Sequence, residues 1–80
     1  MNTREAVAAR IRDLCKDRNI TPNGLSYASG VPQSTIKSIL NGESDNPGVV
    51  TIKLLCDGLG ITLTEFFSTD TFRTMEQEMR

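Results

Sequence analysis

The sequence predicts a small all-α domain, built as a compact five-helix bundle. The chain has 80 residues, which is enough for one domain and too few for two. Hydrophobic residues make up 38% of it and aromatic residues only 5%. Apolar residues recur at helical spacing between segments that favour the start and end of helices. These three observations favour helices over sheets.

The first helix is expected over residues 3–17. Asn2 or Thr3 can cap its start, because a side-chain oxygen there accepts a hydrogen bond from a free backbone N–H group. Its apolar residues fall at i, i+4, i+7 and i+8, on one face: Val7, Ile11, Leu14 and Cys15.

The second helix is expected over residues 22–29. Thr21 can cap it, and Pro22 loses no hydrogen bond at the first helical position. Leu25 and Ala28 are expected to point inward.

A tight turn and a third helix follow. Gly30 can end the second helix, because glycine adopts positive φ without steric cost. Val31-Pro32 is expected to open the next helix, which runs to Leu40. Its apolar face consists of Ile36, Ile39 and Leu40, with Val31 packed in the turn.

A polar loop over residues 43–47 precedes a fourth helix over 48–59. The apolar face of this helix consists of Ile52, Leu55, Cys56 and Leu59. Gly60 closes it. Thr62 and Glu65 have the spacing of a capping box, which predicts a fifth short helix ending near Phe67.

The chain divides, in this prediction, into a domain over residues 3–67 and a tail over 68–80. The tail carries apolar residues at i, i+3 and i+7: Phe72, Met75 and Met79. A short sixth helix can form there if it packs on something, since an isolated helix of this length is marginal. The tail is therefore expected to cap the bundle or to take part in self-association.

Residues 21–41 have the organisation of a helix-turn-helix motif. Ser26 is a small residue where the two helices meet, Gly30 is the turn residue, and Ile36 is expected to lock the second helix onto the first. Such a motif exposes the start of its second helix to the major groove of DNA.

From about Arg10 to Phe67 the sequence resembles the Cro/cI-like (XRE) helix-turn-helix family of bacterial and phage regulators. The motifs that carry the resemblance are Ser29-Gly30-Val31, Ser34-Thr35-Ile36, Leu40-Asn41-Gly42 and Leu59-Gly60-Ile61. The resemblance implies a lambda-repressor-like fold with a helix at residues 32–41 placed in the major groove.

The resemblance also implies the site residues. Gln33 and Ser34 lead the recognition helix, and Gln33 has the amide that pairs with adenine N6 and N7. Further contacts to bases or phosphates are expected from Thr35, Lys37 and Ser38. Contacts to the DNA backbone are expected from Thr21, from the start of the second helix around Asn23, and from Asn41.

The chain departs from the family at several positions. Pro22 stands where a DNA-contacting Gln is usual, Pro32 where a small polar cap is usual, and an acidic loop, Glu43-Ser44-Asp45, where a basic one is common. These changes lower the expected affinity for DNA.

Cys15 and Leu40 stand where many relatives have a partly buried Arg–Glu ion pair. Losing only one partner would leave a buried unpaired charge, so a joint replacement by apolar residues is physically sensible. We therefore expect Cys15 and Leu40 near each other in the core.

The charge distribution suits DNA better than the net charge of −1 does. Residues 21–42 contain Lys37 and no acidic residue, and the acidic residues concentrate in the second half. Four cations in or directly after the first helix allow two interpretations, phosphate contact or i,i+4 pairing with Asp13 and Asp17. These cations are Arg10, Arg12, Lys16 and Arg18.

Composition argues against other classes. The chain has no histidine and two cysteines, so a zinc site of the usual kind and a nucleophile with a histidine base are not expected. We expect no enzyme activity, no cofactor and no small-molecule ligand. No apolar stretch has the length of a membrane span, and the first residues lack the apolar core of a signal peptide. A cytoplasmic protein with reduced cysteines is expected.

Two hypotheses for function follow. The first is a sequence-specific regulator that binds double-stranded DNA, expected to be a repressor and a homodimer on a two-fold symmetric operator. The alternative is a protein-interaction module on the same fold, antitoxin-like or an adaptor, with weak DNA binding. The acidic loop and the acidic C-terminal third of the chain favour the alternative.

Overall fold

Six α-helices form the regular structure of residues 1–43 and 46–78, the part of the chain that this computed structural model describes. They are α1 (Thr3–Asp17), α2 (Pro22–Ser29), α3 (Gln33–Leu40), α4 (Val49–Leu59), α5 (Leu63–Phe67) and α6 (Asp70–Thr74). The expected all-α bundle is confirmed, and the sixth helix forms.

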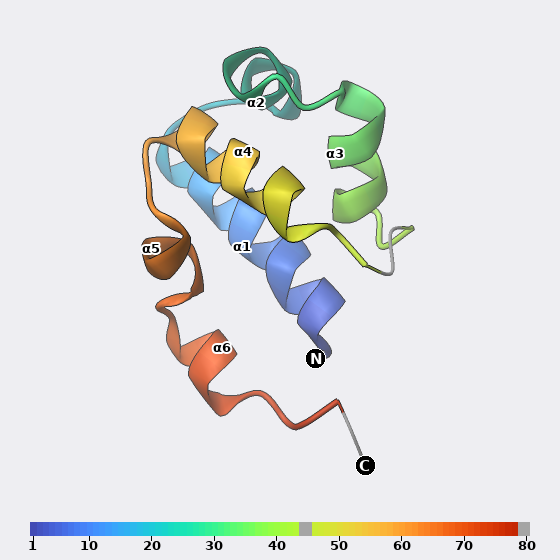
Figure 1. Ribbon diagram of the computed structural model, residues 1–80, viewed down its shortest axis with the longest axis vertical. Helices are drawn as coiled ribbons and strands as arrows, with labels where there is room; N and C mark the ends of the chain where they lie inside the picture. Colours follow the sequence, from blue (N-terminus) through green and yellow to red (C-terminus); the bar gives the residue numbers. More distant parts are fainter. Residues whose placement is uncertain (44–45, 79–80) are drawn as a thin grey trace.

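The helices enclose one core (Figure 1). α2 packs against α3 and α4, α1 packs against α3 and α6, and α4 packs against α5. The predicted stripes of α1, α3 and α4 supply most of the buried side chains, joined by Leu25, Val31, Ile61 and Phe66. Phe66 is fully buried at the centre of this packing.

Local capping explains where the helices begin. The Asn2 side chain accepts from the Glu5 N–H at 2.8 Å, and the Glu5 side chain accepts from the Asn2 N–H at 3.0 Å. Thr62 and Glu65 repeat this reciprocal pattern at α5. Both are capping boxes, which satisfy backbone donors that a helix start leaves unpaired.

Glycines end two helices. Gly30 and Gly60 follow α2 and α4 with φ values of 76° and 72°, in the left-handed region that favours glycine.

The structure corrects three expectations about single residues. Ala28 is exposed rather than inward, because α2 turns Leu25 and Ser29 toward its neighbours. Pro32 precedes α3 as its N-cap residue and gives no side-chain hydrogen bond. Leu40 is only half-buried, although it packs against the core cluster that contains Cys15.

Because Gly58 has no side chain, α2 and α4 can pack closely at this position. A Cβ atom built on Gly58 would lie 2.9 Å from Ser29 Cβ and 3.0 Å from the Ser29 backbone nitrogen. Since the second of these is a backbone contact, a larger residue would force the two helices apart.

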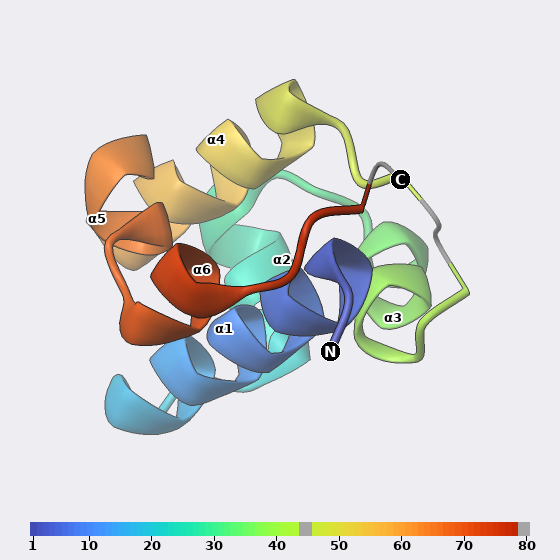
Figure 2. The same ribbon diagram turned by 90° about the horizontal axis from the view of Figure 1, so that it is seen from below.

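The tail folds back on the bundle. Figure 2 shows α6 against α1. The centroid of the Phe72 ring lies 6.2 Å from that of the Phe66 ring and 4.9 Å from that of the Phe67 ring. Met75 is half-buried and lies just beyond α6. The expected third residue of this stripe, Met79, lies outside the described residues, as do Ser44 and Asp45 of the acidic loop.

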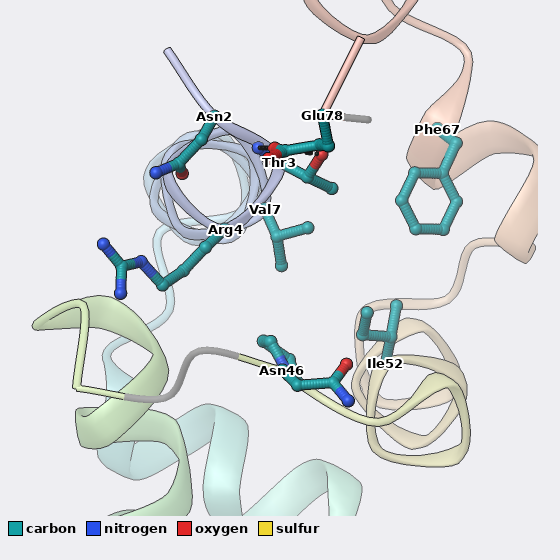
Figure 3. Close-up of a pocket in the computed structure, with 9 residues that line it drawn as sticks. Asn2, Thr3, Arg4, Val7, Asn46, Ile52, Phe67 and Glu78 are labelled. Carbon is teal, nitrogen blue, oxygen red and sulfur yellow. Dashed lines mark hydrogen bonds between the residues drawn. The ribbon is translucent and has the colours of Figure 1, made fainter. Parts of the chain in front are cut away.

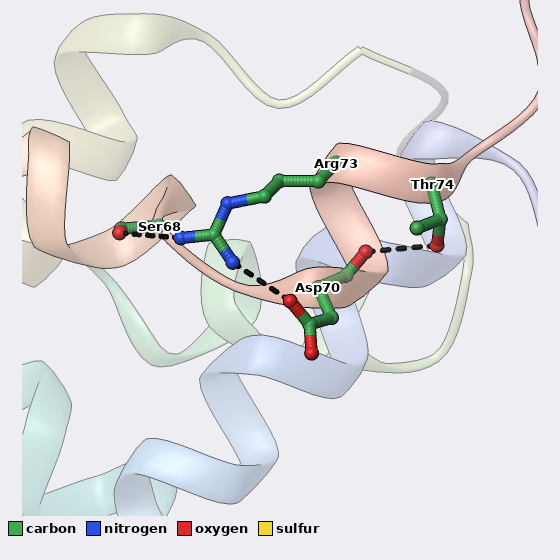
Figure 4. Close-up of polar contacts among 4 residues, drawn as sticks. All are labelled: Ser68, Asp70, Arg73 and Thr74. Carbon is green, nitrogen blue, oxygen red and sulfur yellow. Dashed lines mark hydrogen bonds and ion pairs between the residues drawn. The ribbon is translucent and has the colours of Figure 1, made fainter.

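Hydrogen bonds stabilise α6 locally (Figure 4). Arg73 donates to the Asp70 carboxylate at 2.8 Å and to the Ser68 hydroxyl at 3.2 Å. The Thr74 hydroxyl donates to the Asp70 carbonyl at 2.8 Å. A helix of five residues needs such support, together with the packing of Phe72.

Both cysteines are buried and unpaired with each other. Burial raises the pKa of the Cys15 thiol and of the Cys56 thiol, because the thiolate is poorly solvated inside the protein. The two residues therefore act as small apolar core residues.

Candidate nucleic-acid interface

The turn between α2 and α3 is held by hydroxyl groups. The Ser26 hydroxyl donates to the Val31 carbonyl at 2.6 Å, and the Val31 N–H donates to the Ser29 hydroxyl at 3.2 Å. Gly30 lies between them with positive φ. Ser26 thus lies at the junction of the two helices, as expected, and also fixes the path of the chain into α3.

α3 is fixed to the core by its apolar side. Ile36 and Ile39 are each 1% exposed, and Val31 before the helix is 3% exposed. The opposite side therefore faces solvent. Gln33, Ser34 and Lys37 are exposed, whereas Thr35 and Ser38 are half-buried.

The start of α2 lies beside α3. Thr21 is the N-cap residue, and its hydroxyl oxygen accepts from the Gly24 N–H at 3.0 Å. Pro22 occupies the first turn, and Asn23 follows it in an exposed position. The Thr21 hydroxyl keeps its own proton, so it can still donate to a phosphate oxygen.

An open groove of about 610 Å³ joins the start of α2 to the outer side of α3. Its lining consists of Arg12, Thr21, Pro22, Asn23, Gln33, Lys37, Leu40 and Asn41. Five of the eight predicted site residues therefore meet there. The other three, Ser34, Thr35 and Ser38, do not line the groove.

Arg12 joins this groove from α1. It donates a hydrogen bond to the Leu40 carbonyl at the end of α3, across 28 positions of sequence. The sequence groups Arg12 with the other cations of the first helix and gives no sign that it alone reaches the predicted site. Only the packing of α1 on α3 distinguishes it.

Arg10 of α1 and Arg18, the C-cap residue of α1, bind helix ends elsewhere. Arg10 donates to the carbonyls of Phe66 and Glu65 at 2.8 and 2.9 Å, and Arg18 donates to the Leu59 carbonyl at 2.8 Å. The last carbonyls of a helix lack partners and carry partial negative charge, so guanidinium groups suit them. In the free chain, the guanidinium groups of these two residues donate to helix ends, and phosphate contact by them stays a prediction.

The groove has the charge and hydrogen-bonding groups of an anion site. Arg12 and Lys37 supply positive charge, and Thr21, Asn23, Gln33 and Asn41 supply neutral donors. No acidic residue is among its lining residues. Such a surface can bind the phosphates of a duplex while amide groups reach base edges.

Within residues 1–43 and 46–78, no group of three or more metal-binding side chains comes together. In the same residues, no helix is both long and apolar enough to cross a lipid bilayer.

The family model for the Cro/C1-type helix-turn-helix DNA-binding domain matches residues 10–71. The chain belongs to this family. The Cro/C1-type domain thus includes α1 from Arg10 onward, the α2–α3 motif, α4, α5 and the start of α6. The family assignment identifies α2–α3 as a DNA-binding helix-turn-helix motif and the chain as a candidate regulator of transcription.

A solved structure has the same fold. The crystal structure of the prophage Lp1 protein 11 superposes on this chain with a TM-score of 0.82 and 28% sequence identity. The match covers 92% of this chain and 97% of that protein. No curated protein sequence matches the chain.

Proposed function

We propose that this Cro/C1-type domain is a sequence-specific transcriptional repressor that places α3 in the major groove of DNA. The observation that carries the proposal is the α2–α3 groove, where five predicted DNA-contacting residues meet Arg12 without an acidic neighbour in the lining. Gln33, Lys37 and Asn41 lie along α3 and its C-cap, on the side away from the core.

The proposed contacts divide by role. Gln33 at the first position of α3 reads a base edge, for which an adenine is the natural partner of its amide. Lys37 and Arg12 neutralise phosphates, and Thr21 and Asn41 hold the backbone from the two ends of the groove. Ser34, Thr35 and Ser38 lie outside the groove and remain proposed contacts along the rest of α3.

Repression needs no further activity from the chain. A small domain that occupies a promoter excludes polymerase by volume alone, and we propose neither catalysis nor a cofactor. The proposed protein acts in the cytoplasm as a homodimer on two half-sites. Their centres lie about 34–36 Å apart, one turn of the duplex.

The alternative function, a protein-interaction module, depends on the acidic residues. Two acids of the tail have partners within the chain, since Asp70 pairs with Arg73 and Glu78 accepts from Thr3. We therefore favour DNA as the partner of α3 and treat protein binding as an outcome of the test.

The test is a gel-shift titration of the chain on the DNA upstream of its own gene and on a random duplex, each at several salt concentrations. We expect tighter binding to the upstream DNA and a linear fall of log affinity with log salt, because phosphate contacts release counterions. Equal binding to both duplexes at low salt would contradict the proposal. A stoichiometric protein complex that buries α3 would favour the alternative.

A further inference from the structure

Large apolar side chains left in solvent gather on α4. In the described residues, six such side chains are exposed: Met1, Tyr27, Val49, Val50, Leu54 and Phe67. Val49, Val50 and Leu54 belong to α4 and are 65%, 69% and 41% exposed. No other helix carries more than one of the six.

Val50 and Leu54 share one side of α4 with two charged residues. At 100° per residue, they lie opposite the buried residues Ile52, Leu55 and Leu59. Lys53 and Asp57 lie beside them, and their side chains are 52% and 53% exposed. We call Val50, Lys53, Leu54 and Asp57 the outer α4 face.

Nothing in the described chain covers this face. In Figure 1, α4 lies in front of α1, and in Figure 2 it forms the upper edge of the molecule. The exposed fractions of Val50 and Leu54 agree with both views. The outer α4 face is therefore free for a partner.

The tail of the same chain has a different place. The Glu78 carboxylate accepts from the Thr3 N–H at 2.7 Å and from the Thr3 hydroxyl at 2.9 Å (Figure 3). This contact borders a pocket of about 400 Å³ that is also lined by Val7, Ile52 and Phe67. Ile52 lies on the core side of α4, so the tail is held away from the outer α4 face.

The charges of the outer α4 face are self-complementary. Across a two-fold axis, if residue i of one protomer contacts residue j of its partner, then residue j contacts residue i by symmetry. If two α4 helices pack in antiparallel orientation, Lys53 of one protomer can meet Asp57 of the other, twice. Leu54 then lies near the centre of the contact, and Val50 lies at each of its two ends.

We propose that the outer α4 face is a self-association surface, on which two copies of this chain pack α4 against α4 about a two-fold axis. The inference names the interface of the homodimer in the proposed function and rests on that part of it. Lys53 and Asp57, which pair within one chain in the free protein, exchange partners across the interface.

The interface is small, and the dimer is accordingly weak in free solution. The 11 residues of α4 span about 16 Å at 1.5 Å per residue. A contact of that length buries less than the roughly 1,200 Å² of a standard stable interface. Binding to adjacent half-sites raises the effective concentration of the second copy, so the dimer forms chiefly on DNA.

Charge reversal tests the antiparallel contact. Lys53→Glu gives a wholly acidic pair on each copy and Asp57→Lys a wholly basic pair, so each variant alone repels itself. An equal mixture of the two restores both cross-pairs. We expect the mixture to associate as the wild type does, while each variant alone associates at least about tenfold more weakly.

Sedimentation velocity from about 1 μM to 1 mM measures this association without DNA. Leu54→Glu should also weaken it by about tenfold or more, and Tyr27→Glu, which changes an exposed apolar residue on α2, should leave it unchanged. A wild type that stays monomeric throughout overturns the proposal. So does a mixture that associates no better than its components, or an equal loss in the Tyr27 variant.

A second readout separates this proposal from the proposed function. On a duplex that contains one half-site, Leu54→Glu should bind as tightly as the wild type, whereas on two half-sites it should lose cooperative binding. Retained cooperativity in Leu54→Glu contradicts the α4 interface and leaves DNA binding intact. Failure of the wild type to bind the half-site contradicts the proposed function, and the sedimentation result still decides the interface.

Discussion

At the scale of single residues, exposure separates the positions that bind from the positions that hold the fold. On α3, Gln33 is exposed and Ile36, three positions later, is 1% exposed. The two side chains belong to one short helix, but the first faces solvent and the second is packed in the core. A substitution at each therefore reports on a different property.

Gln33→Ala should relax base preference at one position of each half-site, at a cost of about 1–3 kcal/mol in discrimination. The melting temperature should stay close to that of the wild type, because the side chain is exposed. Gel shifts on a panel of single-base operator variants measure the change. Lys37→Ala is the comparison, since loss of a phosphate contact should weaken all duplexes alike and lower the salt slope by about 1. Equal weakening of Gln33→Ala on every duplex would assign Gln33 to the DNA backbone instead.

Ile36→Ala should lower the free energy of unfolding by about 2–5 kcal/mol, because it removes a buried side chain between α3 and the core. Urea unfolding followed by circular dichroism measures the loss. Tyr27→Ala is the control, since Tyr27 is 95% exposed and its truncation should cost little. An unchanged free energy of unfolding in Ile36→Ala would show that Ile36 does not lock the motif.

At the scale of helices, local signals in the sequence predict the boundaries closely. Caps and glycines around α1, α2 and α5 give their bounds to within one residue, since a cap acts through its own neighbours. α3 begins later than predicted, because Pro32 serves as the residue before the helix. The polar side of α3 is also predictable from the sequence, because it lies opposite the apolar stripe.

Contacts between helices are less predictable from the sequence. Ala28 fits an apolar stripe by spacing, but α2 is short and its orientation is set by Ser29 against Gly58 of α4. Arg10, Arg12 and Arg18 donate to carbonyls 28 to 56 positions away, which no local pattern encodes. A glycine inside a helix is a usable signal, since it costs about 1 kcal/mol relative to alanine and often has a packing reason.

Gly58→Ala should reduce the free energy of unfolding, because its new methyl group meets the Ser29 backbone. Overpacking lowers the stability by about 1–3 kcal/mol, and the better helix propensity of alanine offsets up to about 1 kcal/mol of that loss. Thermal and urea unfolding measure the net loss. Gly48→Ala is the matched control, since the atom nearest to its added Cβ would be Thr51 Oγ1 at 3.9 Å. A gain in stability at Gly58→Ala would mean that α2 and α4 can separate at little cost.

At the scale of the whole molecule, the tail acts as a cap on the bundle. It contributes Phe72 to the aromatic contacts around Phe66 and places Glu78 at the first residues of α1. The division into a domain of residues 3–67 and a tail of 68–80 stays a prediction, and removal of the tail tests it.

Deletion of residues 69–80 should lower the melting temperature and leave the mass in solution unchanged. The bundle loses the packing of Phe72 and the Thr3–Glu78 hydrogen bonds, whereas the outer α4 face is untouched. Calorimetry and light scattering measure the two properties. If the truncated chain loses the self-association of the full chain, the tail forms the dimer contact and the outer α4 face does not. A truncated chain that keeps the full melting temperature would show that the tail adds no stability.

The hydrogen bond between Thr3 and Glu78 has a consequence for chain topology. Because positions 3 and 78 meet, a short linker can join them, and new ends can be opened in the loop between α3 and α4. Such a circular permutant keeps every helix of the native fold while a contact 75 positions apart becomes local. Loop closure for that contact then costs less entropy, so the permutant should fold faster than the parent chain in stopped-flow refolding. A slower permutant would show that the two ends of the chain meet only after the folding barrier has been crossed.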